Sequence, residues 1–197
     1  MTPRPRPAVF LDKDGTLVEN VPYNTDPAGI RLAPGAPEAL RLLHGAGRRL
    51  VVVSNQSGVA RGLFPEGALL GVERRLRELL ADVGVPLGGF YYCPHHPEAR
   101  LVSYRARCRC RKPMPGLLLR AAEELDLDLE RSWMVGDILD DVEAGSRSGC
   151  RTTLILNGGE TLWRTGPRRF PDLVASDLLE AATCLLELDV PRERVAR

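Results

Sequence analysis

Acidic and hydroxyl side chains follow three short apolar runs of the chain. Asp12 and Asp14 come directly after the run 8–11, Ser54 follows a second run, and Asp137 follows a third. Two neighbouring carboxylates raise each other's pKa unless a cation neutralises them. Such a pair therefore either binds a hard metal ion or divides the roles of nucleophile and acid–base group between its members.

Groups suited to binding an anion lie near the same run ends. Ser54 opens the turn Ser54–Gly58, whose backbone N–H groups could surround a phosphate, and Lys112 places a cation just before a predicted helix. Taken alone, the pair Asp12 and Asp14 is also compatible with a solvated turn. However, three apolar runs are each followed by a carboxylate or a hydroxyl. This pattern favours a site for a metal ion and an anion over a solvated turn.

A second set of potential metal ligands lies where regular periodicity disappears. Cys93 and His95 form one pair, and Cys108 and Cys110 form the other. Three cysteines and one histidine match the tetrahedral ligand set of structural zinc, and zinc would order a loop that has no apolar core of its own. His96 fits the C-x-H…C-x-C spacing less well. The alternative is a group of buried thiols beside a solvated histidine.

The composition restricts what the chain can bind. Its 197 residues carry a net charge of +1, so it lacks the basic excess that is typical of nucleic-acid-binding proteins. No apolar run approaches the length of a membrane span, and no secretory leader precedes the five cysteines. We therefore expect a cytoplasmic protein with no nucleic-acid or membrane partner, in which Cys150 and Cys184 are core thiols.

Strands and helices are predicted to alternate along the chain. The predicted strands are 8–11, 49–53, 89–92, 133–136 and 152–156; the predicted helices are one opened by 34–37 and closed at Gly45 or Gly47, then 69–83, 115–125, 140–148 and 177–188. This alternation indicates an α/β fold with a Rossmann-like, doubly wound parallel sheet. Ligands of such sheets bind beyond the carboxyl ends of the strands. We predict a disordered N-terminal tail at 1–7, one domain at 8–190 with a zinc-binding loop at 93–112, and a C-terminal tail at 191–197.

These motifs resemble those of the haloacid dehalogenase (HAD) phosphatase superfamily. The matching residues are, in order, Phe10–Thr16 (FLDKDGT), Ser54, Lys112, and Gly136–Asp137 followed by Asp141. The resemblance spans nearly the whole chain and implies the HAD fold. The segments between the motifs are too short for a cap domain, so loops alone should cover the site. Asp141 would orient water around the metal ion, or it is an ordinary carboxylate at a helix start.

The resemblance also implies a role for each motif residue. Asp12 would attack phosphorus and form an aspartyl-phosphate, while Asp14 would protonate the leaving group and then activate water. Mg²⁺ would be held by Asp12, Asp137 and the main-chain carbonyl of Asp14. Ser54 and Lys112 would bind the phosphoryl oxygens and stabilise charge in the transition state.

Further segments narrow the resemblance to two related groups. Residues 91–97, Cys108–Pro113 and Ser54–Gly62 resemble the D-glycero-D-manno-heptose 1,7-bisphosphate 7-phosphatases of nucleotide-activated heptose biosynthesis, and the histidinol-phosphate phosphatases share the zinc loop. The first group implies a monomer that converts a phosphorylated sugar, heptose 1,7-bisphosphate, to heptose 1-phosphate. Ile138 stands where those enzymes commonly have lysine, which keeps histidinol phosphate as the alternative substrate. The implied substrate contacts are Asn20, Val21, Pro22, Tyr23, Ser54, Asn55, Gln56, Ser57, Arg111 and Lys112.

Two other interpretations belong to different functional classes. A zinc-stabilised binding protein could keep this fold without turnover, although the complete set of motif residues argues against it. The arginines of the zinc loop are also compatible with a phosphatase that processes nucleic-acid ends, which the near-neutral net charge disfavours. The sequence therefore favours a phosphatase acting on a small phosphate ester.

Overall fold

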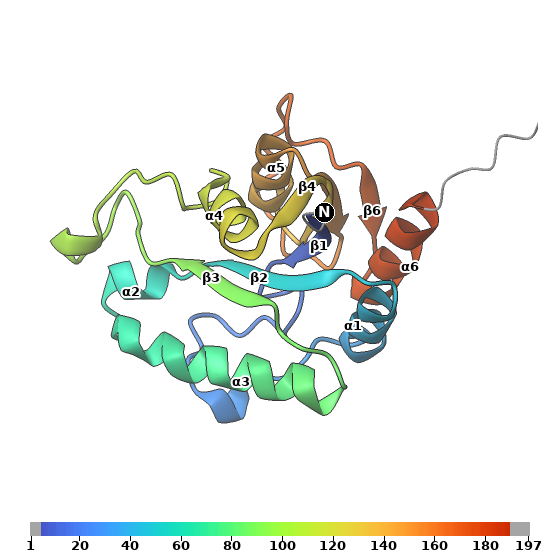
Figure 1. Ribbon diagram of the computed structural model, residues 1–197. Helices are drawn as coiled ribbons and strands as arrows, with labels where there is room; N and C mark the ends of the chain where they lie inside the picture. The colour runs from blue at the N-terminus through green and yellow to red at the C-terminus, as the bar shows by residue number, and fades with distance from the viewer. Residues whose placement is uncertain (1–4, 190–197) are drawn as a thin grey trace, which may run out of the picture.

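A parallel sheet of six strands forms the centre of the molecule, in the order β3-β2-β1-β4-β5-β6 (Figure 1). The computed structural model describes residues 5–189. The strands are β1 (Arg6–Leu11), β2 (Arg49–Asn55), β3 (Gly89–Cys93), β4 (Leu127–Gly136), β5 (Arg151–Ile155) and β6 (Leu173–Ala175). The helices are α1 (Ala36–Gly45), α2 (Ser57–Arg61), α3 (Leu69–Asp82), α4 (Gly116–Leu125), α5 (Leu139–Ser148) and α6 (Leu178–Asp189), with the short 3-10 turns η1 (Pro27–Gly29), η2 (Glu66–Ala68) and η3 (Val102–Tyr104).

Helices cover both faces of the sheet. Helices α1, α3 and α6 pack against one face, and α4 and α5 against the other (Figure 1). In β1, Val9 and Leu11 pack into the core beneath α1, α3 and α6, whereas Ala8 and Phe10 pack into the core on the opposite face. A strand whose successive side chains are buried on opposite faces reads as a continuous apolar run, as expected for the middle of a parallel sheet.

The predicted doubly wound sheet is confirmed, and the element ends differ in ways that have local causes. The strand β1 begins at Arg6, so it includes two residues that the sequence analysis assigned to the tail, because Arg6 and Pro7 pair with the start of β4. That pairing also makes β4 six residues longer than the predicted strand 133–136. The predicted C-terminal tail 191–197 and residues 1–4 lie outside the described residues.

Two elements were not predicted. Helix α2 spans only one turn, and β6 has three residues of which one is exposed, so neither has the periodicity that reveals longer elements. No separate folded unit is inserted between β1 and α1 within residues 5–189, where the chain forms only the turn η1. None of the described helices is long and apolar enough to cross a bilayer.

Candidate active site and metal sites

The carboxyl ends of three adjacent strands, β2, β1 and β4, converge on one cavity. Asp12 follows β1, Ser54 is the next-to-last residue of β2, and Asp137 follows β4. The cavity has a volume of about 210 Å³. Its lining residues are Asp12, Asp14, Asn20, Ser54, Asn55, Lys112, Asp137, Ile138 and Gly159. The predicted chemistry-bearing residues of three distant segments are therefore brought together at the edge where ligands of parallel sheets bind.

Lys112 is the cation at the centre of this arrangement. Its Nζ lies 2.6 Å from Asp12 Oδ1 and 2.6 Å from Asp141 Oδ1, and it donates a hydrogen bond of 3.0 Å to the carbonyl of Val53. Burial disfavours the charged ammonium, but the two carboxylates outweigh that effect and hold the pKa of Lys112 above its ordinary value. Lys112 is therefore charged although only 1% of it is exposed.

Three acids, Asp12, Asp137 and Asp141, form what we call the carboxylate cluster. One oxygen of each lies within 4.8 Å of the others. Burial, reinforced by the charge of Asp12, raises the pKa of Asp137 to about 7. Burial also raises the pKa of Asp141, and the ion pair with Lys112 offsets only part of that rise. One lysine cannot balance three ionised carboxylates, so the metal-free cluster favours bound protons, which a bound cation would replace.

The surroundings of Asp137 fit a bound cation. No ion pair links Asp137 to a lysine or arginine among the ion pairs of residues 5–189. A Cβ at Gly15 would lie 2.2 Å from Asp137 Oδ2, and one at Gly159 would lie 2.0 Å from the same oxygen. Only glycine allows the two loops to approach the carboxylate this closely. The carboxylate cluster is thus a suitable place for a hard cation, whose preferred ligands are oxygen atoms.

Asp14 belongs to a separate hydrogen-bonded group. Lys13 Nζ lies 2.5 Å from Asp14 Oδ1, and Gln56 Nε2 donates to Ser54 Oγ at 2.8 Å and, more weakly, to Asp14 Oδ2 at 3.5 Å. Burial raises the pKa of Asp14 despite the opposing charge of Lys13. Lys13 was not among the predicted site residues, and it is 2% exposed.

The two predicted substrate-contacting segments meet beside Asp14. A cavity of about 180 Å³ lies between them. Its lining residues are Lys13, Asp14, Asn20, Pro22, Tyr23, Asn24, Asn55, Gln56, Ser57 and Gly58. Val21 is 44% exposed and is absent from this lining. Arg111 lines neither cavity, and its Nη1 donates to the carbonyl of His95 at 3.4 Å.

A loop that sequence reasoning missed completes the rim of the site. Asn157 Nδ2 donates a hydrogen bond to the carbonyl of Gly15, and Glu160 Oε2 accepts one of 2.8 Å from the backbone N–H of Leu139 at the start of α5. These contacts bring Gly159 against the carboxylate cluster. The segment between β5 and β6 has no apolar periodicity, so turn residues such as the glycine pair at 158–159 are what marks it in the sequence.

Cys93, His95, Cys108 and Cys110 form a second cluster, the Cys/His cluster. The three Sγ atoms lie 3.2 to 3.5 Å apart, and His95 Nδ1 lies 3.7 Å from Cys93 Sγ and 3.6 Å from Cys110 Sγ. All five cysteines, which lie within the described residues, are free thiols. Four ligand atoms this close fit a single small tetrahedral ion. His96 is outside the cluster, so the preference for His95 agrees with the geometry.

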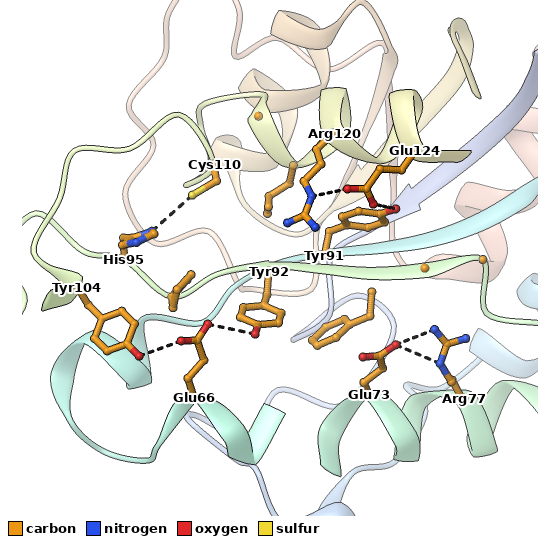
Figure 2. A pocket seen from close by; sticks show the side chains of 16 residues that line it. Glu66, Glu73, Arg77, Tyr91, Tyr92, His95, Tyr104, Cys110, Arg120 and Glu124 are labelled. Atoms are coloured by element: carbon orange, nitrogen blue, oxygen red, sulfur yellow. Dashed lines mark hydrogen bonds and ion pairs between the residues drawn. The ribbon is translucent and has the colours of Figure 1, made fainter. Parts of the chain in front are cut away.

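A wider cavity, about 630 Å³, is a groove along the edge strand β3. Its charged side chains contact one another (Figure 2). Arg77 pairs with Glu73 at 2.7 Å and Arg120 with Glu124 at 2.7 Å. Glu66 accepts hydrogen bonds from the hydroxyls of Tyr92 at 3.1 Å and Tyr104 at 2.8 Å. Both arginines are paired with glutamates, and none of the predicted catalytic residues lines this groove.

Comparisons with known proteins agree with this geometry. A HAD-hydrolase-like family model matches residues 109–181. D-glycero-beta-D-manno-heptose-1,7-bisphosphate 7-phosphatase from Yersinia pestis is 39% identical over 160 residues, which cover 81% of this chain and 85% of the relative. The enzyme of the same name from Photorhabdus laumondii is 40% identical over 174 residues, covering 88% and 92%.

Two solved structures extend the likeness to the fold. A HAD-like phosphatase from Mesorhizobium loti matches with a TM-score of 0.80 and 35% identity, covering 98% of this chain and 91% of its own. D,D-heptose 1,7-bisphosphate phosphatase from B. bronchiseptica, complexed with magnesium and phosphate, matches with a TM-score of 0.75 and 30% identity, covering 92% and 99%. The chain belongs to the HAD-like family of D-glycero-beta-D-manno-heptose-1,7-bisphosphate 7-phosphatases.

Proposed function

We propose that this chain is a Mg²⁺-dependent phosphatase that converts D-glycero-beta-D-manno-heptose 1,7-bisphosphate to heptose 1-phosphate. One observation carries the proposal. The five residues whose types suit this reaction, Asp12, Asp14, Ser54, Lys112 and Asp137, line a single cavity at the strand ends. Relatives that match over about four fifths of the chain share this activity in their name, which favours the heptose substrate over histidinol phosphate.

Asp12 is the proposed nucleophile. Its carboxylate oxygen would form a bond to phosphorus while the bond from phosphorus to the sugar oxygen breaks, which gives an aspartyl-phosphate. The ion pair with Lys112 Nζ at 2.6 Å orients the Asp12 carboxylate. A Mg²⁺ ion bound by Asp12, Asp137 and the main-chain carbonyl of Asp14 would reduce the repulsion between the attacking carboxylate and the anionic phosphate.

Asp14 is the proposed acid–base group. Its proton would pass to the sugar oxygen as that oxygen leaves, and Asp14 would then remove a proton from the water that attacks the aspartyl-phosphate. The raised pKa of Asp14, caused mainly by burial, suits a carboxyl that must first donate a proton. Ser54 and Lys112 would hold the phosphoryl oxygens throughout.

The Cys/His cluster would hold a structural zinc ion. Its four protein ligands leave no position for substrate, which is typical of structural rather than catalytic zinc. Zinc thiolates and the free thiols of Cys150 and Cys184 support a cytoplasmic location as part of this proposal, because reducing compartments preserve thiols. The proposed substrate is the only partner that this function requires, and we expect a monomer.

A substrate comparison tests the proposed function. With Mg²⁺ present, kcat/KM for heptose 1,7-bisphosphate should exceed that for histidinol phosphate, as measured by release of inorganic phosphate. The opposite order would overturn the substrate assignment while leaving a phosphatase. Ile138, which lines the cavity as an apolar side chain, makes histidinol phosphate a necessary comparison.

Asp12→Asn tests the nucleophile. It should lower turnover by about 10³-fold or more, because an amide oxygen cannot form the aspartyl-phosphate, and the thermal unfolding midpoint should change little. Asp140→Asn is the matched control, since Asp140 pairs with Arg169 at 2.6 Å and does not line the cavity. Activity retained by Asp12→Asn would show that the nucleophile is misassigned.

A further inference from the structure

The side chain of Asn55 is bonded to the main chain of a residue far away in sequence. Its Oδ1 accepts a hydrogen bond of 3.0 Å from the backbone N–H of Lys112. Its Nδ2 donates one of 3.1 Å to the carbonyl of the same residue. Both polar atoms of one carboxamide are thus used on one residue, which fixes the orientation of the backbone at Lys112 and not merely its distance.

Lys112 needs such support because its own segment provides little. Between the end of β3 and the start of α4, the turn η3 is the only helical or strand element. The ammonium must nevertheless reach a buried position beside Asp12 and Asp141. A lysine side chain has four flexible bonds, so a displaced backbone would let Nζ move away from a place that costs free energy to occupy.

One strand contacts both ends of Lys112. The carbonyl of Val53 accepts from Nζ at 3.0 Å, and Asn55, two residues further along β2, bonds the main chain. The strand β2 lies inside the sheet between β3 and β1, so it is among the more rigid parts of the molecule. Lys112 therefore takes its position from the sheet and not only from its loop.

We propose that Asn55 is a positioning residue that holds Lys112 at the phosphoryl site. The family resemblance instead implied that Asn55 contacts the substrate directly. The inference rests on the proposed function in one respect, namely that Lys112 binds the transferred phosphoryl group. It adds a specific dependence, because every effect of Asn55 on turnover should pass through Lys112.

A double-mutant cycle distinguishes the two roles. Asn55→Ala should lower kcat by about 10- to 100-fold, as small displacements of catalytic groups do, with KM changed less than about threefold. In a Lys112→Ala background the same substitution should have no further effect beyond about twofold, since the residue through which it acts is gone. Single-turnover release of phosphate with enzyme in excess makes the slow variants measurable.

Asn20→Ala is the matched control in the same cycle. Asn20 lines the same cavity as Asn55 but forms no hydrogen bond with Lys112, so its effect should multiply with that of Lys112→Ala. If the effects of Asn55→Ala and Lys112→Ala also multiply, Asn55 acts on the substrate and the proposal is overturned.

Hydrogen exchange gives a readout that is independent of activity. In the zinc-loaded protein, Asn55→Ala should speed exchange of the Lys112 amide, measured by NMR, with zinc content and circular dichroism unchanged. Unchanged exchange at Lys112 would contradict the proposal. If Asn55→Ala loses zinc, Asn55→Asp replaces it, because it keeps the acceptor for the Lys112 N–H and loses only the donor to the Lys112 carbonyl. For this variant the readout is kcat, which should fall when Lys112 is present and change less than about twofold in the Lys112→Ala background. Wild-type protein without heptose-bisphosphatase activity would refute the proposed function, and the exchange result would still decide the role of Asn55.

Discussion

The carboxylate cluster and the Cys/His cluster are both suited to a metal ion, but the fold prepares them differently. The acids of the first follow or flank central strands, are buried, and have Lys112 as an internal counter-ion. The ligands of the second come from the end of the edge strand β3 and from a loop in which Leu101 and Val102 are exposed. The sheet forms the first site in advance, whereas the second must order its own surroundings.

The two clusters also differ in how far their charges are balanced before a metal ion binds. In the carboxylate cluster a charged lysine offsets part of the repulsion before any metal binds. In the Cys/His cluster burial raises the pKa of the Cys93 thiol, and a bound metal ion would favour its thiolate form. The two regions meet in the chain, since Cys110 stands two residues before Lys112. A zinc ion that ordered the loop would therefore also help to position Lys112 at the strand-end site.

Removal of zinc should produce the largest effect that separates the two regions. In the double variant Cys108→Ser/Cys110→Ser, turnover with saturating Mg²⁺ should fall by about 10²-fold, because Lys112 loses one of the anchors of its segment. Far-UV circular dichroism should change little, since the sheet does not depend on the loop.

Cys184→Ser is the matched control for zinc removal. It removes a thiol of α6 that lies outside the Cys/His cluster and should leave both turnover and zinc content unchanged. Full turnover in a zinc-free double variant would mean that the sheet and Asn55 alone position Lys112. In that case the proposed dependence of one site on the other fails.

The strand-end site was the more predictable of the two at the level of residues. Asp12, Ser54 and Asp137 each end an apolar run, and parallel strands bring such ends to one edge. The Cys/His cluster was also predictable, since ligands two residues apart, such as Cys93 and His95, stay close together whatever conformation the loop adopts. Both predictions depended on spacing along the chain, which the fold preserves.

The contacts that join distant segments were not predictable from one sequence. Nothing in the pattern relates Asn55 to the main chain of Lys112. Every residue except proline offers the same backbone N–H and carbonyl, so the sequence does not mark which residue a side chain will bond. Burial of Lys13 and the approach of Gly159 to Asp137 likewise depend on how loops pack. β6, three residues long, gave too little alternation to detect.

The second prediction concerns how pH affects the carboxylate cluster. Folding raises the pKa of Asp137 from 3.8 to about 7, so the folded metal-free protein binds this proton more tightly than the unfolded chain. Its contribution to stability is therefore lost as pH rises from about 4 to about 7. A metal ion needs the ionised carboxylate, so the apparent affinity for Mg²⁺ should rise by up to about tenfold per pH unit below pH 7.

Calorimetry in two buffers of different ionisation enthalpy measures this linkage. Binding of Mg²⁺ at pH 6 should release about one proton, and far less at pH 8. Asp140→Asn should behave like the wild type, since its carboxylate pairs with Arg169 outside the cluster. No proton release at pH 6 would indicate that Asp137 is already ionised there and that folding does not raise its pKa to about 7.

The smallest expected effect concerns a second attachment of the zinc loop. Glu66 accepts hydrogen bonds from Tyr92 of β3 and Tyr104 of η3 (Figure 2), so it ties the far end of the loop to the sheet edge. Glu66→Gln keeps one acceptor oxygen and removes the charge, which should weaken this attachment by about 1 kcal/mol. Amide exchange near Tyr104 should then rise about fivefold, while kcat/KM falls less than about threefold.

Glu73→Gln isolates the contribution of the attachment itself. Glu73 lies in the same groove but pairs only with Arg77 on its own helix, so its loss should leave exchange in the zinc loop unchanged. We expect zinc removal to lower activity more than Glu66→Gln does. An equally large fall in activity for Glu66→Gln would contradict this ranking. The edge strand, through Glu66, would then position Lys112 as strongly as the metal does. The Cys/His cluster would in that case resemble the strand-end site, as a place that the fold prepares before the ion arrives.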